Sequence, residues 1–264
     1  MHFETVNQSK KVMGGSIASI LFISLISLWP FFPNAQTLVD SSSNKSNVET
    51  EFSPVTITGF GNALTASYER LQRGVSAFNA NSQLAPLAVL KFHVSESEKN
   101  NIPLALRLEL DDGHWLPIEV DVEGYFVLPE ITGPQVKTAQ IVANRKNGIA
   151  KIEPNTTSPG LAVGTSRLGD LRLTCSVRWA IYGEDAPLAL RAMTALTDGP
   201  CNNRLIRMYV MPRAGEKTKK IFLQEGSRKL ELVEDGLRRG FITPLHDQSW
   251  SNEARYVSEF NPEQ

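Results

Sequence analysis

The sequence predicts a mainly β protein with minor α, built from antiparallel β-sandwich units, an N-terminal amphipathic helix and a disulfide-pinned helical insert. Three observations predict this class. Apolar and polar residues alternate in short stretches along 88–144 and 205–243, tight-turn pairs such as Asp112-Gly113 separate these stretches, and few segments have a helical spacing of apolar residues. Short alternating strands joined by tight turns favour antiparallel sheets over a parallel α/β fold.

Composition limits the classes of function. The chain has 264 residues with 27 Lys and Arg against 28 Asp and Glu, a net charge of −1. A nucleic-acid binder normally needs a basic face that displaces counterions from phosphates, so no nucleic-acid partner is expected. Hydrophobic residues at 41% and charged residues at 21% are ordinary for a folded protein, which excludes wholesale disorder.

The N-terminal segment has the layout of a targeting signal. Lys10-Lys11 precede an uncharged, largely apolar run over residues 12–33, and Asn34-Ala35-Gln36 follow it. This layout predicts a signal peptide over residues 1–35. About 22 such residues are also enough to span a bilayer, so an uncleaved N-terminal anchor is the alternative. In both cases the rest of the chain is expected in the periplasm or outside the cell, and only this segment would contact the membrane.

Residues 36–54 are rich in Ser and Asn, which predicts a flexible linker. A first unit over 55–150 follows, and it begins with the short β-type stretch 55–59. A helix is then predicted, with Asn62 as N-cap and residues 79–82 as its end. Its apolar residues are spaced 4, 3, 4 and 3 apart and share one face: Leu64, Tyr68, Leu71, Val75 and Phe78.

The remainder of this unit predicts an antiparallel meander, which together with the helix forms a first β-sandwich unit. Tight turns are expected at Asp112-Gly113 and Glu123-Gly124. Strands are predicted over 89–94, 104–110, 115–120, 125–129 and 137–144.

Residues 151–202 are predicted as a strand–helix insert. Six apolar residues alternate along 171–181, which favours a strand, and a helix after Gly169-Asp170 is the alternative. A second helix is predicted with Asp185 as N-cap and Pro187 in its first turn. Its inward side chains would be Leu190, Met193 and Leu196.

The insert contains both cysteines, Cys175 and Cys201, which are 26 residues apart. Export places them in an oxidising compartment, where a disulfide is expected to pin the end of the second helix to the preceding segment. The chain-entropy model assigns such a bridge roughly 3–4 kcal/mol. The pair lacks the CxxC spacing of a redox-active site.

Residues 203–264 are predicted as a second β unit, with strands over 205–211, 220–223, 229–233 and 241–244. Their order and turns resemble those of the first unit. Either an internal duplication or convergent hairpin patterns would produce this correspondence, and the sequence leaves both open.

No catalytic constellation is found in the exported part. His93, His114 and His246 lack a second ligand at a recognised zinc spacing. His246-Asp247 would supply part of a hydrolase triad, but no GxSxG elbow accompanies it. Asp111-Asp112 are the acidic residues that a tight turn itself favours. We therefore expect no catalytic residue, no metal and no cofactor.

The stretch from Leu106 to Pro129, with its strand–turn–strand pattern ending in Tyr-Phe-Val-Leu-Pro, resembles the carboxypeptidase regulatory-like (transthyretin-type) β-sandwich. The tracts 141–145, 158–161 and 167–173 are similar to uncharacterised exported proteins of Gram-negative bacteria. The resemblance implies an accessory or binding module and brings no catalytic residues with it. The helix-plus-disulfide insert has no counterpart in a plain transthyretin-like domain.

The sequence thus predicts an exported, non-enzymatic cell-envelope protein that serves as a binding or structural module for a protein or polymer ligand. One alternative is a periplasmic hydrolase that uses His246-Asp247 or His114. Another is an assembly partner of an envelope machine, docking through the helix over 64–78 or through an open strand edge.

Overall fold

The computed structural model describes residues 62–97, 101–161, 165–196, 199–204, 206–211, 218–236 and 240–260. Within these ranges strand residues outnumber helical ones and neighbouring strands of every sheet are antiparallel. The predicted mainly β class with antiparallel sheets is therefore confirmed. The predicted signal, linker and 55–59 stretch lie outside these residues. No helix among the residues described is long and apolar enough to cross a membrane.

The first sheet has four strands in the order β1–β6–β3–β4. β3 and β4 form the predicted hairpin, and Gly113 in its turn has a φ of 82°, which residues with a Cβ rarely adopt. Leu106, Leu108 and Ile141 are buried on its inner face. The strands are β1 Ala63–Ser67, β3 Leu106–Glu109, β4 Trp115–Ile118 and β6 Gln140–Lys146.

A second sheet has the order β5–β2–β7. Its strands are β2 Val89–Glu96, β5 Tyr125–Phe126 and β7 Ala150–Thr157. β7 contains Pro154, which an edge strand tolerates because proline has no N–H to donate. Phe92 of β2 lies opposite Phe126 of β5, and the two rings are 5.7 Å apart.

The first helix, α1 Tyr68–Ala80, begins later than the sequence predicted. Ser67 is its N-cap and accepts a hydrogen bond from Arg70 N, so the prediction of Asn62 as N-cap is wrong. Leu64 lies in β1, where it pairs with Ala143 of β6. Leu64 would be buried in a helix and is buried in the strand, so its burial does not favour the helix. Backbone pairing with β6 therefore decides the conformation in spite of the helical spacing. The predicted end is confirmed, because Asn81 is the C-cap.

The C-terminal part forms two more sheets, in the orders β11–β10–β14–β8 and β12–β13–β9. The strand predicted over 205–211 is reduced to two residues, because Ile206 N bonds to Asn203 O in a turn. The strands are β8 Ser166–Arg167, β9 Tyr209–Val210, β10 Thr218–Glu225, β11 Arg228–Glu231, β12 Glu234–Asp235, β13 Gly240–Ile242 and β14 Arg255–Phe260.

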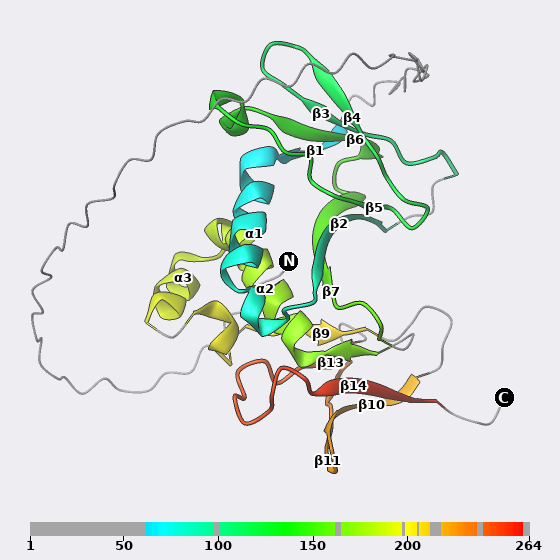
Figure 1. Ribbon diagram of the computed structural model, residues 1–264, viewed down its shortest axis with the longest axis vertical. Coiled ribbons are helices and arrows are strands. Elements are labelled where there is room, and N and C mark those ends of the chain that lie inside the picture. The colour runs from blue at the N-terminus through cyan, green and yellow to red at the C-terminus, as the bar shows by residue number, and fades with distance from the viewer. Residues whose placement is uncertain are drawn as a thin grey trace, which may run out of the picture. The chain divides into compact units, whose positions relative to one another are not determined.

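Buried apolar residues form two clusters. The first joins Tyr68 and Leu71 of α1 to Leu108 and to Phe92, which come from two different sheets. The second joins apolar residues of β10, β13 and β14 to the loop that contains Trp250. A second helix, α2, lies beside α1 and contributes to both clusters (Figure 1).

α2 spans Leu168–Tyr182, so the strand favoured for residues 171–181 is wrong and its helical alternative holds. Leu171, Cys175 and Trp179, at a spacing of four, pack in the second cluster. Val177 and Ile181, also four apart, pack in the first cluster. The two helical stripes are offset by two residues. Together they place an apolar residue at every second position, which is the pattern of a strand.

Candidate functional site

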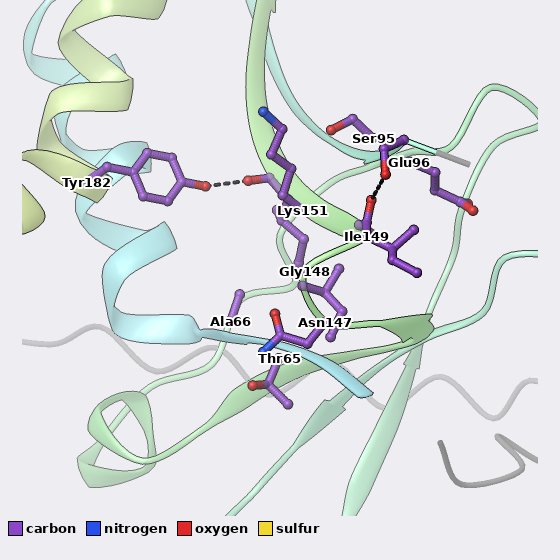
Figure 2. A pocket seen from close by; sticks show the side chains of 13 residues that line it. Thr65, Ala66, Ser95, Glu96, Asn147, Gly148, Ile149, Lys151 and Tyr182 are labelled. Carbon is purple, nitrogen blue, oxygen red and sulfur yellow. Dashed lines mark hydrogen bonds between the residues drawn. The ribbon is translucent and has the colours of Figure 1, made fainter. Parts of the chain in front are cut away.

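An open cleft of about 630 Å³ lies where β1, the end of β2, the β6–β7 turn and the end of α2 meet (Figure 2). This volume falls within the range of about 300–1,000 Å³ that is typical of ligand sites. Thr65 and Ala66 line one side, Gly148 and Ile149 the turn, and Tyr182 the helix side. No single segment of the sequence contains this set, so sequence reasoning missed the cleft.

The charged side chains near the cleft neutralise one another. Arg145, whose side chain is only 5% exposed, donates from Nε to Oε1 of Glu96 at 2.5 Å. Glu153 lies 2.7 Å from Lys151 Nζ and 3.1 Å from Arg178 Nη2. Burial acts to raise the pKa of Glu153, but these two cations outweigh it and hold that pKa below its ordinary value. The cleft therefore suits an uncharged ligand better than an anion or a cation.

Two hydroxyl groups bring polarity to the cleft. Tyr182 donates its hydroxyl proton to the carbonyl of Ile152 in β7, and burial raises the pKa of Tyr182 to about 12. Ser95 Oγ is buried at the cleft and has no hydrogen-bond partner among the described residues. Neither hydroxyl bonds to a histidine or a carboxylate, so the described contacts do not activate either one as a nucleophile.

The three histidines lie on different elements. His93 in β2 bonds through Nε2 to the carbonyl of Glu123 at 3.1 Å. His114 lies 3.0 Å from Asp112 in the β3–β4 turn, with its side chain 81% exposed. His246 follows β13, and burial together with the charge of Arg204 lowers its pKa.

The neighbour of His246 does not complete a triad among the described contacts. Asp247 accepts hydrogen bonds from Ser249, from N at 3.0 Å and from Oγ at 2.6 Å, and these bonds lower the pKa of Asp247. The carboxylate therefore shapes a local turn instead of orienting the imidazole. In the part of the chain that the structure describes, no three His, Cys, Asp or Glu side chains gather where they would hold a metal ion.

The predicted disulfide between Cys175 and Cys201 is confirmed, with Cα atoms 5.9 Å apart. It joins the middle of α2 to the short helix η4 Pro200–Asn202. Between the two cysteines, η3 Gly183–Asp185 and α3 Leu188–Ala195 complete the insert. The bridge therefore closes a loop that contains α3 and ties the segment after α3 to α2 within the second cluster.

α3 presents an apolar face outward. Leu190 is 2% exposed, as predicted for an inward residue, but Met193 is 43% and Leu196 is 88% exposed, so those two predictions are wrong. Thr194 takes the inward position instead, and Leu188 is 73% exposed. The inward side of this two-turn helix is too narrow for all the apolar residues that its sequence carries. Clustered apolar side chains on a surface mark interaction sites.

Comparison with protein-family models, with curated proteins and with solved structures finds no match to this chain. The fold and the site therefore define a class only: a mainly β protein with antiparallel sheets, an internal disulfide and an exposed apolar helix.

Proposed function

We propose that the protein is an exported, non-enzymatic module of the cell envelope that binds a protein partner through the outward face of α3. The observation that carries this proposal is the exposure of Leu188 and Met193 on α3 and of Leu196 at its C-cap, in a segment that a disulfide closes. Burying apolar surface against a partner contributes roughly 25 cal/mol per Å². A helix that is already ordered loses little further entropy on binding, which favours affinity.

Two features support the export of this module. The apolar run over residues 12–33 has the layout of a targeting segment. The Cys175–Cys201 bridge is of a kind that persists in oxidising compartments. The contacts of the cleft hydroxyls support a binding role over a hydrolytic one, because a hydrolase needs a general base within hydrogen-bond reach of its nucleophile, and the described contacts of Tyr182 and Ser95 include no histidine or carboxylate.

We also propose that each pair of sheets packs as a transthyretin-type sandwich. Leu108 of the first sheet and Phe126 of the second belong to one buried cluster, which supports face-to-face packing. An experimental structure in which the two sheets do not share this core would overturn the sandwich.

Site-specific photo-crosslinking in cells that naturally produce the full chain tests the binding surface. A photoreactive residue at Met193 should form an adduct with one protein, whereas the same group at Leu230, which is 39% exposed on β11, should not. Leu188→Asp with Leu196→Asp should abolish the adduct at position 193. Equal adducts at both positions, or an adduct that survives the two aspartates, would contradict the proposal.

The redox state of the cysteines tests export independently. Thiol trapping in the same cells should find both cysteines oxidised, and a block of the secretion machinery should leave them reduced. Cysteines that stay reduced in untreated cells would exclude an exported module.

A further inference from the structure

β1 is the end strand of the first sheet, and its outer edge borders the cleft. Just after β1, Tyr68 N bonds to Ala139 O at 3.0 Å, in the register that β1 makes with β6. Bonded residues alternate along an antiparallel strand, so Ala66 also bonds toward β6, whereas Thr65 directs its N–H and C=O away from β6. Thr65 is exposed and lines the cleft, and no described strand pairs with this edge. The cleft therefore contains a backbone donor and acceptor that no described residue uses.

The opposite side of the cleft is formed in part by β7, whose outer edge is already used. Val94 N bonds to Gly124 O, on the side of β5. Ile152 lies opposite Val94, so it directs its N–H and C=O away from β2. Its carbonyl accepts the hydroxyl proton of Tyr182 (Figure 2), and two residues further along the same edge Pro154 has no N–H to donate. Of the two edges at the cleft, β1 is therefore the one that can accept a further strand.

The other end strands of the described sheets have features that hinder strand pairing. In β4, Pro117 is at a position that does not bond to β3, so the N–H that it lacks would have pointed outward. β11 has three exposed charged residues, Arg228, Lys229 and Glu231. β5, β8, β9 and β12 have two residues each. β1 reads Ala-Leu-Thr-Ala-Ser, without a proline or a charge, and is the least protected of these edges.

The surroundings of this edge fit an extended segment with few charges. Arg145 pairs with Glu96, and Lys151 pairs with Glu153, so a charged side chain that entered the cleft would lose hydration without gaining a free counter-ion there. Ser95 Oγ is buried at the cleft and has no partner among the described residues. A backbone amide or carbonyl of an entering segment would supply that partner.

We propose that the outer edge of β1 is a second binding surface, which takes an extended, weakly charged segment of a partner protein as an additional strand. The N–H and C=O of Thr65 form main-chain hydrogen bonds with this segment, and the cleft holds its side chains. Main-chain bonds give affinity in this mode of recognition, whereas the space for alternate side chains gives specificity. The site uses no residue of α3, so it does not depend on the surface proposed there.

Amide hydrogen exchange of the purified full chain, measured by NMR, tests whether the edge is open. The amide of Ala66, which bonds to β6, should exchange at least about tenfold more slowly than the amide of Thr65. Equal protection of the two amides in the absence of a partner would show that another part of the same chain covers the edge, and would overturn the proposal.

Photo-crosslinking in cells that naturally produce the chain tests the occupant. Asn147 is exposed and lines the cleft (Figure 2), so a photoreactive residue there should form an adduct with a different protein. Mass spectrometry should locate the adduct in a stretch with few charged residues. An adduct within the same chain, with a second copy of it, or with a molecule that contains no peptide would contradict a partner's strand.

Three substitutions of one residue separate backbone pairing from side-chain contact. Thr65→Pro removes the outward N–H without removing a bond to β6, so it should reduce the adduct at least about tenfold. Thr65→Lys keeps the N–H but places a charge on the edge, and it should reduce the adduct without constraining the backbone. Thr65→Val, the matched control, loses only the hydroxyl and should retain the adduct. An adduct that survives both Thr65→Pro and Thr65→Lys, or that is lost in Thr65→Val, would refute main-chain pairing.

The same variants distinguish this surface from the outward face of α3. Leu188→Asp with Leu196→Asp should leave the adduct at position 147 unchanged, and Thr65→Pro should leave the adduct at position 193 unchanged. Loss of the adduct at position 147 in the aspartate variant would assign it to the partner of α3 and would overturn a separate site at β1.

Discussion

The guanidinium group of Arg172 donates a hydrogen bond from Nη1 to Oδ1 of Asn252 at 2.7 Å. The same side chain, within a residue that is only 4% exposed, also donates to the carbonyls of Leu245, Asp247 and Trp250. Burial lowers the pKa of Arg172, yet the group stays charged at neutral pH because the ordinary value is so high. One helical side chain therefore organises the loop that leads into β14.

Replacement of this arginine should destabilise the fold. Arg172→Met keeps much of the apolar stem but leaves several carbonyls without their donor, so we expect a loss of about 3 kcal/mol in the free energy of unfolding. Urea denaturation followed by circular dichroism measures it. Arg255→Met is the matched control, since Arg255 is exposed on β14, and it should change stability by less than about 0.5 kcal/mol. Equal effects of both variants would refute the role of Arg172.

The contact between α1 and α2 depends on the absence of a side chain at Gly74. A Cβ at this position would lie 2.6 Å from Cδ1 of Ile181, which is 1% exposed and packed in the first cluster, so room for it requires the neighbouring side chains to shift. Overpacking costs roughly 1–3 kcal/mol, and the better helix propensity of alanine returns up to about 1 kcal/mol. Gly74→Ala should therefore destabilise the protein by about 1 kcal/mol.

A double-mutant cycle checks this contact. Ile181→Ala removes both atoms that the added Cβ would meet, Cδ1 at 2.6 Å and Cγ1 at 2.7 Å, so the two substitutions together should cost about 1 kcal/mol less than the sum of their separate costs. Gly236→Ala, a site with open space around it, serves as the control and should be close to neutral. Strict additivity in the cycle would show that the helices do not meet at Gly74 as described.

Removal of the disulfide should weaken the second cluster. The bridge closes a loop of 26 residues, and Cys175→Ala with Cys201→Ala is expected to lower the free energy of unfolding by about 3–4 kcal/mol. Reduction of the unmodified protein with dithiothreitol should lower it by a similar amount. If unfolding in urea is the same with and without reductant, the bridge does not stabilise the fold.

Tyr182 should make stability depend on alkaline pH. Its folded pKa of about 12 exceeds its unfolded value of about 10, so the neutral hydroxyl stabilises the fold fully below pH 10, and this contribution is lost as the pH rises through 12. A shift of this size corresponds to at most about 2–3 kcal/mol. The free energy of unfolding should decline between pH 9 and pH 11.5, and Tyr182→Phe should remove the part of this decline that Tyr182 causes. Parallel curves for the two proteins would contradict the burial of this hydroxyl.

Local patterns predicted much of the fold. The turns at Gly113 and Gly124 and the strands beside them depend on neighbouring residues only, and the structure contains both. The end of α1 at Asn81 is likewise a local signal. The beginning of α1 was predicted wrongly, because pairing of Leu64 with Ala143, nearly eighty residues away, decides where the strand ends.

The sequence by itself determined the antiparallel β class, the pairing of Cys175 with Cys201 and the likeness of the two halves, since each depends on residue types, counts and short spacings. Tertiary structure alone decided the conformation of α2, the outward face of α3 and the cleft beside Tyr182. The physical reason is burial. α2 packs between two clusters, so it has apolar residues on two sides, and these two helical stripes together look like the alternation of a strand. Only the neighbours that pack against α2 distinguish the two conformations.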